Sequence, residues 1–436
     1  MSNIIRGRAL TGALGLMAVL GAAGEAAASG FMLREQSSEG LGNAFAGSTA
    51  KAYNLSTIFY NPAGMTRLEG SQVAGSATWI APVAKFEGTN TVSGAGFNNG
   101  QTRGSMGGDA IKDAAVGALY AFWDARPDLK FGMAVSAPFG LRSEYDEDWV
   151  GRYHALESSI TNINVQPTVA YRINDKLSIG GGAQVAYTKV RLSNALNLGA
   201  LHPLTSDGKS TVEGDDIGFG GVASVLYEFT PTSRVGLNYR SQIQHTLEGD
   251  AKFEVSPAHK ALLGNPQSLR DMSAQADLTT PDTVSLGIYH ELSPQWAVMS
   301  DVQWTNWSTF KEVRIRFDDG RPDSVTDESW KDTWFFSLGA TYTMDQHNKF
   351  HFGVAYDQAP VGTEHRTARI PDSNRYWLSA GYTYDLNPNF QANIGYTHIF
   401  ADKAEINEAS TNNSGRLVGS YDAYVDIFSA SLVWKF

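Results

Sequence analysis

The chain has 436 residues, with 44 Gly, no Cys and only 18% charged side chains, and its mean hydropathy is −0.25. A soluble α/β enzyme of this length carries roughly a quarter charged residues and recurrent amphipathic helical windows, and few such windows occur here. The net charge of −11 disfavours nucleic-acid binding, and the absence of Cys excludes disulfide frameworks, thiolate metal sites and cysteine nucleophiles.

The N-terminus is typical of a secretory signal peptide. An apolar run from Ala9 to Gly24 follows Arg6 and Arg8 and precedes the small residues 26–28. The run is shorter than the roughly 20 apolar residues of a membrane-spanning helix. The alternative is a buried N-terminal helix. We predict cleavage after Ala28, which removes residues 1–28 and leaves 408 residues with 32 basic and 44 acidic side chains, a net charge of −12.

Residues 29–69 are rich in Gly, Ala and Ser and show no alternation of polar and apolar residues. A short helix is predicted around Leu41–Ala52. A disordered periplasmic extension is the alternative, but it would leave Phe31, Phe45 and Phe59 in water. We expect this segment to form a plug, or hatch, inside the structure that the remaining residues build.

Residues 70–436 are dominated by period-two alternation, which places successive side chains on opposite faces of a strand. In residues 129–137 the large apolar side chains take every odd position. Six short turns alternate with seven long polar stretches, so that thirteen connections join about fourteen strands. Short turns on one side and long loops on the other are the pattern of a closed antiparallel outer-membrane β-barrel. A barrel of this size has a lumen wide enough for a hatch.

Aromatic residues support a membrane location for these strands. They bracket the short turns, as Trp123, Tyr171 and Trp296 do, and amphipathic rings favour the boundary between hydrocarbon and headgroups. The chain also ends in an alternating strand with Phe436 at its terminus. Such a strand resembles the signal read by the barrel-assembly machinery; an ordinary closing strand is the alternative. The sequence therefore predicts an all-β protein of the outer membrane of a Gram-negative bacterium, with lipopolysaccharide and membrane lipid around it.

Three motifs resemble the FadL family of outer-membrane transporters for long-chain fatty acids and hydrocarbons. They are the start Ser29-Gly30-Phe31, the segment of residues 40–47, and residues 59–65, which contain Asn61-Pro62-Ala63. Further similarity at residues 137–141, 149–153, 356–361 and 370–372 extends the resemblance over nearly the whole exported chain. The resemblance implies a monomeric, passive transporter of hydrophobic molecules without cofactor or enzyme activity.

The resemblance further implies release of substrate sideways, through a gap where one strand is kinked against the hatch. We expect Asn61, Pro62 and Ala63 to lie beside the third strand, from Leu129 to Leu141. Pro138 cannot donate a ladder hydrogen bond, and Gly132 and Gly140 permit irregular geometry. Ordinary barrel bends are the alternative for these three residues.

The loop of residues 139–158 is the predicted capture site. Phe139, Leu141, Trp149 and Tyr153 offer apolar contacts, and Arg142 or Arg152 is a candidate partner for a carboxylate unless neighbouring acids pair with it. The movable chain end, Ser29, Gly30 and Phe31, is the predicted gate.

Other functions have weaker support in the sequence. His347 and His351 straddle a turn and a strand start, so their rings do not converge as metal ligands, and we predict no metal site. A plugged porin for a small polar solute is the second hypothesis. A barrel phospholipase, which needs an outward-facing Ser and His, is the third.

Overall fold

The computed structural model describes residues 30–94, 97–200, 206–264, 266–409 and 414–436. The predicted signal peptide and Ser29 lie outside the described residues. The strands are β1 (Gln72–Gly94), β2 (Phe97–Gln101), β3 (Ala114–Arg126), β4 (Leu129–Ser136), β5 (Gly140–Glu144), β6 (Glu157–Arg172), β7 (Leu177–Leu196), β8 (Gly208–Thr230), β9 (Ser233–Arg240), β10 (Ile243–Glu254), β11 (Met272–Thr280), β12 (Thr283–Glu291), β13 (Trp296–Thr305), β14 (Glu312–Phe317), β15 (Ser324–Asp327), β16 (Thr333–Thr343), β17 (Asn348–Asp357), β18 (Arg375–Asn387), β19 (Phe390–Ala401), β20 (Ala404–Ala409) and β21 (Arg416–Lys435).

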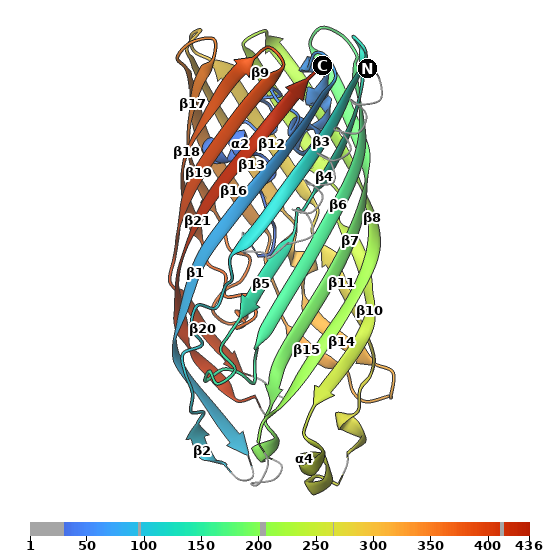
Figure 1. Ribbon diagram of the computed structural model, residues 1–436, viewed down its shortest axis with the longest axis vertical. Coiled ribbons are helices and arrows are strands. Elements are labelled where there is room, and N and C mark those ends of the chain that lie inside the picture. The colour runs from blue at the N-terminus through green and yellow to red at the C-terminus, as the bar shows by residue number, and fades with distance from the viewer. Residues whose placement is uncertain (1–29, 95–96, 201–205, 265, 410–413) are drawn as a thin grey trace, which may run out of the picture.

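The strands form one closed antiparallel barrel (Figure 1). Closure is made by β1 and β21, which pair continuously from Gln72 with Lys435 to Thr91 with Arg416. Several wall strands are interrupted, so that β4 and β5, β9 and β10, β11 and β12, and β13 and β14 are each two parts of one strand. Counted in this way, the wall has fourteen strands, as predicted, with short additional strands at the loop end.

Short turns and long connections lie at opposite ends of the barrel (Figure 1). The upper end carries the short turns and the C-terminus, and is therefore the periplasmic end of an outer-membrane barrel. Near these turns, Trp123, Tyr171, Trp296 and Trp434 are exposed on the outer wall. This arrangement is the aromatic girdle expected at a membrane boundary.

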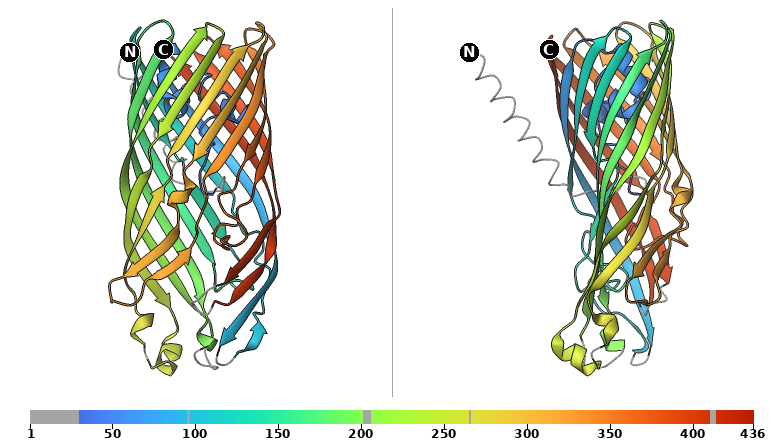
Figure 2. Two further views of the ribbon diagram at one scale, coloured as in Figure 1. Left: turned by 180° about the vertical axis from the view of Figure 1, so that it is seen from behind. Right: turned by 90° about the vertical axis from the view of Figure 1, so that its right-hand side faces the viewer.

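The hatch occupies the lumen near the periplasmic end, as the blue segments in Figure 2 show. It contains α2 (Ser38–Gly42), α3 (Thr57–Tyr60) and the 3-10 helix η1 (Pro62–Arg67). The predicted helix over residues 41–52 is wrong. The helix ends at Gly42 because Ala44 and Phe45 adopt positive φ angles of 49° and 59°, which a right-handed helix cannot contain.

The remaining helices are α4 (Pro257–Leu262), η2 (Leu198–Ala200), η3 (Gln267–Leu269) and η4 (Trp307–Thr309). Within the described ranges, every helix is too short or too polar to cross a membrane.

Candidate functional site

The third wall strand is interrupted between β4 and β5, and the first residues of the hatch pair with the interruption. Leu33 N donates to Pro138 O, and Gly140 N donates to Phe31 O, both at 2.8 Å. Met32 and Phe139 are thereby opposed as an isolated antiparallel bridge. The segment of residues 31–33, which precedes the hatch body, is therefore attached to the wall where the strand ladder is broken.

The interruption also opens the ladder toward the second strand. Pairing between β3 and β4 ends at Leu119 and Val135, whereas pairing between β4 and β6 continues to Ser136. On the described chain, residues 114–118 of β3 pair with β1 but with no residue of the third strand. At the level of Pro138, the described chain therefore has no backbone hydrogen bonds between β3 and the third strand.

Phe31 lies in an aromatic cluster and is completely buried. Its ring centroid is 4.7 Å from that of Trp307, 5.5 Å from Phe310, 5.8 Å from Trp330 and 6.0 Å from Phe139. Edge and tilted contacts at these separations are favourable aromatic geometries. The cluster joins the chain end to residues from three separate parts of the barrel.

Gly30 anchors the same segment by a hydrogen bond. Its N–H donates to Asp372 Oδ2 at 2.7 Å, and Asp372 is buried and paired with Arg375. Gly30 has a φ of 66°, and a Cβ there would lie 2.5 Å from a ring carbon of Trp330. Only glycine meets both conditions without displacing the tryptophan.

A cavity, which we call the outer cavity, lies on the loop side of the Phe31 cluster. Its position follows from β6, which begins at the loop end of the barrel. The outer cavity contacts Ser158 and Ile160 near the start of β6, whereas a second cavity, described below, contacts Asn162 and Asn164 further along. The apolar lining of the outer cavity includes Leu141, Ile160, Val190, Leu192, Leu247, Leu278, Phe310, Val313, Ile315 and Ile370. The lining is therefore predominantly apolar, as it is in binding sites for hydrophobic ligands.

Four ionisable residues line the outer cavity: Glu213, Asp277, Glu328 and Arg369. Glu213 and Asp277 are partly exposed and paired with Arg191 and Arg316, whereas Glu328 is buried. Arg369 Nη1 donates to Ser158 Oγ at 3.1 Å, and desolvation lowers the Arg369 pKa. Burial, together with the charge of Glu408, raises the pKa of Glu328 to about 8. Trp330 Nε1 donates to Glu328 Oε2 at 3.1 Å. At neutral pH Arg369 and Glu328 thus present a cation and a largely protonated carboxyl group in an apolar lining.

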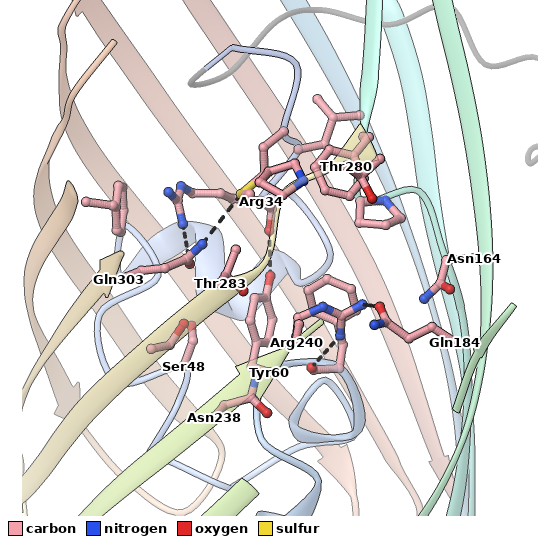
Figure 3. Close-up of a pocket in the computed structure, with 18 of the residues that line it drawn as sticks. Arg34, Ser48, Tyr60, Asn164, Gln184, Asn238, Arg240, Thr280, Thr283 and Gln303 are labelled. Carbon is pink, nitrogen blue, oxygen red and sulfur yellow. Dashed lines mark hydrogen bonds between the residues drawn. The ribbon is translucent and has the colours of Figure 1, made fainter. Parts of the chain in front are cut away.

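A second cavity of about 850 Å³, the inner cavity, lies between the hatch and the wall (Figure 3). The hatch contributes Met32, Leu33, Arg34, Phe45, Ser48, Thr49, Phe59 and Tyr60. Pro138 and Phe139 line it at the strand interruption. Leu141, two residues after Phe139, lines the outer cavity. The third strand therefore contacts both cavities within a few residues, and the Phe31 cluster packs against it there.

The inner cavity is far more polar than the outer one. Asn162, Asn164 and Asn238 line it and are almost completely buried. Among the described residues, neither amide atom of Asn164 has a hydrogen-bond partner, nor has Oδ1 of Asn162 or Asn238. Arg240 Nη1 donates to Gln166 Oε1 at 2.7 Å, and its Nη2 donates to Gln184 Oε1 at 2.5 Å. Unpaired buried amides are costly, which makes this wall suited to a polar group of a ligand.

The prediction that Asn61, Pro62 and Ala63 lie beside the third strand is wrong. Asn61 Nδ2 donates to Val225 O at 3.1 Å, and Ala63 N donates to Ser224 Oγ at 2.9 Å, both on β8. Asn61 Oδ1 also accepts from Ala63 N at 3.1 Å, which caps η1 with Pro62 as its first residue. The motif therefore begins a helical turn, with Asn61 as its cap and Pro62 as its first residue. The hydrogen bonds of Asn61 and Ala63 to β8 attach the hatch body to the wall.

The interpretation of Gly132 as part of the kink is also wrong. Gly132 pairs regularly with Phe122 on β3 and Thr168 on β6. A Cβ at this position would lie 2.6 Å from Met65 Sδ, so the glycine permits close approach of the hatch. The interruption is confined to residues 137–139, between β4 and β5, and Gly140 is the first residue of β5.

Trp149, Arg152 and Tyr153 do not line either cavity. Trp149 is buried among loop residues, and its ring stacks on Tyr145 with centroids 3.9 Å apart. Arg152 Nε donates to Asp207 Oδ2 at 2.7 Å, and its Nη2 donates to the Tyr153 hydroxyl at 3.0 Å. These three residues build the extracellular loops, and the structure does not bring them to the cavities with Phe31, Phe139 and Leu141.

The two candidate arginines both have carboxylate partners of their own. Arg142 Nη2 lies 3.3 Å from Glu144 Oε2, at the exposed loop surface, and Arg152 is paired with Asp207. Sequence reasoning missed Arg369, which is distant in the chain and follows an irregular stretch without periodicity. It also missed Asp372, although residues 370–372 belong to the recognised motifs. In the described ranges, no His, Asp and Glu side chains gather in threes as a metal site.

The fold and the site define a hatch-filled outer-membrane β-barrel with internal cavities suited to hydrophobic molecules. The family described as outer membrane protein transport protein (OMPP1/FadL/TodX) matches residues 19–436, and the chain belongs to this family. The chain is therefore an outer-membrane protein of a transporter family.

Individual relatives agree with this assignment. The chain is 29% identical over 409 residues to a long-chain fatty acid transport protein of Escherichia coli (strain CFT073), covering 88% of this chain and 90% of the relative. A Pseudomonas aeruginosa FadL homologue superposes with a TM-score of 0.86 at 24% identity, covering 93% and 100%. The Ralstonia pickettii toluene transporter TbuX gives 0.64 at 18% identity, covering 94% and 99%. The two structures establish the fold.

Proposed function

We propose that this chain transports long-chain fatty acids, or closely similar amphipathic hydrocarbons, passively across the outer membrane. The substrate enters the outer cavity from the loop side, passes the Phe31 cluster into the inner cavity, and leaves sideways through the wall between β3 and the third strand. The transport family supports the general activity, and the two cavities support the nature of the substrate.

Capture takes place in the outer cavity. Its lining removes the acyl chain from water, which is favourable by about 0.8 kcal/mol for each buried CH₂ group. Arg369 holds the carboxylate, because its guanidinium faces the cavity and a charge-assisted hydrogen bond is strongest in such an apolar lining. Glu328 does not repel the substrate while it is protonated.

Passage then requires movement of the chain end, residues 30–33. This segment is attached by the Gly30 hydrogen bond, two backbone bonds to the third strand, the Phe31 ring and the buried side chains of Met32 and Leu33. Each attachment is local, so a ligand that displaces the ring releases the whole segment without unfolding the hatch body. An acyl chain entering the cluster competes directly with Phe31 for the same aromatic partners.

The inner cavity favours an amphipathic substrate over a bare hydrocarbon. Asn164 offers an unpaired donor and acceptor, and the Arg240 guanidinium lies in the same wall. A carboxyl group satisfies such groups, whereas a toluene-like molecule leaves them unpaired at a cost of about 1–3 kcal/mol each. The Escherichia coli relative is named for long-chain fatty acids, which agrees with this preference.

The observation that carries the proposal is the pairing of residues 31–33 with the broken strand, directly between the two cavities. It permits a reversible test, because the chain has no native Cys. Met32 and Phe139 form a non-hydrogen-bonded antiparallel pair, whose Cα atoms lie about 4.5 Å apart, within the range for a disulfide. The double variant Met32→Cys, Phe139→Cys therefore locks the chain end to the wall when oxidised.

We expect uptake of labelled oleate by cells carrying the oxidised double variant to fall to the level of cells without the protein. Reduction with dithiothreitol should restore it. The two single cysteine variants are the matched controls and should transport under both conditions. Undiminished uptake by the fully oxidised double variant would contradict the proposed gate.

The exit route requires a separate measurement. A fatty acid carrying a diazirine near its carboxyl group, activated during transport, should label residues 114–118 of β3 and Pro138. Labelling of Glu39, Lys51 and His351, which line a polar cavity on the periplasmic side of the hatch, would instead indicate passage straight through the lumen. That result would refute lateral release and favour the porin-like alternative.

A further inference from the structure

The outer wall carries an apolar groove across five strands. It runs over β18, β19, β21, β1 and β3 and has a volume of about 1190 Å³, open toward the membrane. Exposed Trp79, Ile394, Tyr396 and Phe428 rise from it, with Ala77 and Ala430 between them. Small residues next to large rings leave a channel in a surface that is elsewhere covered by apolar side chains.

The floor of the groove is backbone. Gly381 and Gly395 are paired on adjacent strands and both line it. On the lumen side, a Cβ on Gly42 of the hatch would lie only 2.7 Å from Gly381 Cα. The hatch packs directly on the lumen side of these glycines, whereas on the lipid side the small side chains of Ala380 and Ala430 leave the groove open.

A polar cluster lies at one end of the groove, on the same outer face. Tyr396, which lines the groove, donates its hydroxyl hydrogen to Asp426 Oδ1 at 2.7 Å. His398 Nδ1 lies 2.8 Å from the same oxygen, and His398 and Asp426 are direct cross-strand partners. Both contacts are thus made through Oδ1 of Asp426. Charged side chains on the lipid face of a barrel are costly and rare.

The depth of this cluster follows from β21. Trp434 lies in the periplasmic aromatic girdle, and Asp426 precedes it by eight residues on the same face. Eight residues of a strand tilted by about 40° span roughly 20 Å along the membrane normal, in an apolar band about 25 Å tall. Asp426 is therefore in the outer leaflet, a few ångströms below the headgroups, whereas Ala430 is close to the middle of the bilayer.

We propose that this groove binds one acyl chain of an outer-leaflet glycolipid, lipopolysaccharide, with the cluster of Tyr396, His398 and Asp426 holding the polar start of that chain. A carboxylate only accepts hydrogen bonds, so a lipid group that binds Asp426 must be a hydrogen-bond donor. The 3-hydroxyacyl amides of lipid A carry hydroxyl and N–H donors at this depth. The glycerol esters of ordinary phospholipids carry only acceptors.

The test measures lipid retained by the purified full-length protein. Nanodiscs of phosphatidylethanolamine with a minor fraction of lipid A are dissolved, and the lipids bound to the barrel are counted by native mass spectrometry. Wild type should retain lipid A in preference to phosphatidylethanolamine. Asp426→Leu removes the acceptor, and retention should fall about tenfold, as for loss of one good hydrogen-bonded contact. Ala430→Phe fills the groove and should have at least the same effect.

Matched controls are available on the same face of the wall. Asp422→Leu changes an outward carboxylate nearer the loops, and Ala392→Phe enlarges an outward alanine that does not line the groove. Both should retain lipid A as wild type does, and the heat-modifiable mobility of each variant confirms a folded barrel. Wild-type retention no greater than the lipid A fraction of the disc, or equal retention by folded Ala430→Phe, would overturn the proposal. Stronger retention of phosphatidylethanolamine would overturn the assigned lipid class.

Discussion

Replacement of Phe31 by alanine should detach the chain end from the wall while leaving the barrel intact. The ring is completely buried and contacts four other aromatic rings, whereas the strand ladders of the barrel do not involve it. Truncation of a buried Phe to Ala typically costs 3–5 kcal/mol. The rest of residues 30–33 is held by three backbone hydrogen bonds and by the buried side chains of Met32 and Leu33, which the variant keeps, so the loss of the ring contacts falls on the attached state.

A loss of 3 kcal/mol shifts the equilibrium between attached and detached chain end by roughly 150-fold, and 5 kcal/mol shifts it by several thousandfold. Two amides report this equilibrium directly. Leu33 N–H is bonded to Pro138 and Gly140 N–H to Phe31, so both exchange with solvent only when the segment leaves. Hydrogen exchange at these two amides should therefore accelerate by at least about 100-fold in Phe31→Ala.

Phe45→Ala is the matched control. Phe45 is also a buried hatch phenylalanine, but its ring contacts Tyr60 and Trp377 instead of the Phe31 cluster. Phe45 shares a hydrophobic cluster with Leu33 but not with Phe31 and Phe139, so its truncation should leave exchange at Gly140 nearly unchanged. Equal acceleration in both variants would mean that the hatch moves as one body. Unchanged exchange in Phe31→Ala would mean that the aromatic cluster does not hold the segment, and would refute the reasoning.

Three further predictions follow from charged groups. Asp372→Asn weakens the acceptor for Gly30 N–H, and Leu33 exchange should accelerate about tenfold or more, as for one charge-assisted hydrogen bond, without loss of heat-modifiable mobility. The pKa of Glu328 is raised to about 8 by burial, so fatty-acid affinity measured by calorimetry should fall as pH rises through 8, and should stay flat in Glu328→Gln. Burial raises the pKa of Glu35 to about 7, above its ordinary 4.5; the stability that this carboxyl contributes is thus full below about 4.5 and is lost as pH rises through 7. Hatch amide exchange, corrected for its intrinsic pH dependence, should rise over that window in wild type and remain constant in Glu35→Gln.

Much of the barrel was predictable because its chemistry repeats along the chain. Each wall strand must place one face in lipid and the other in the lumen, so the character of its side chains alternates with a period of two residues. The alternation of short turns with long connections then determined the strand number and the orientation. The hatch was recognisable as a separate segment, but its helix was not, because Ala44 and Phe45 take left-handed backbone angles that only packing inside the barrel explains.

The cavities were less predictable because their walls are assembled from distant segments. Phe31, Phe139 and Leu141 were accessible through motifs and through the break at Pro138. Arg369 could not be predicted, because it lies in an irregular connection and no sequence pattern distinguishes it from Arg152. Only the folded chain shows that Arg152 is paired with Asp207 and that Arg369 lines the outer cavity. The inward amides of Asn162 and Asn164 were visible as the polar face of a strand, but nothing in that alternation indicates that Asn164 lacks a partner.

The wall glycines explain why one end of the hatch can move while its body cannot. At four positions a Cβ would lie within 2.4 Å of hatch backbone atoms: Gly180 against Ala63 N, Gly236 against Thr49 O, Gly353 against Asn43 C, and Gly395 against Ser38 O. The body from Ser38 onward is therefore in direct backbone contact with strands around the barrel, and its removal would require breaking these contacts together. None of these four glycine contacts involves residues 30–33. These residues are held by the Phe31 ring, the buried side chains of Met32 and Leu33 and a few hydrogen bonds. An acyl chain can replace such apolar contacts, so displacement should stop where the glycine contacts begin.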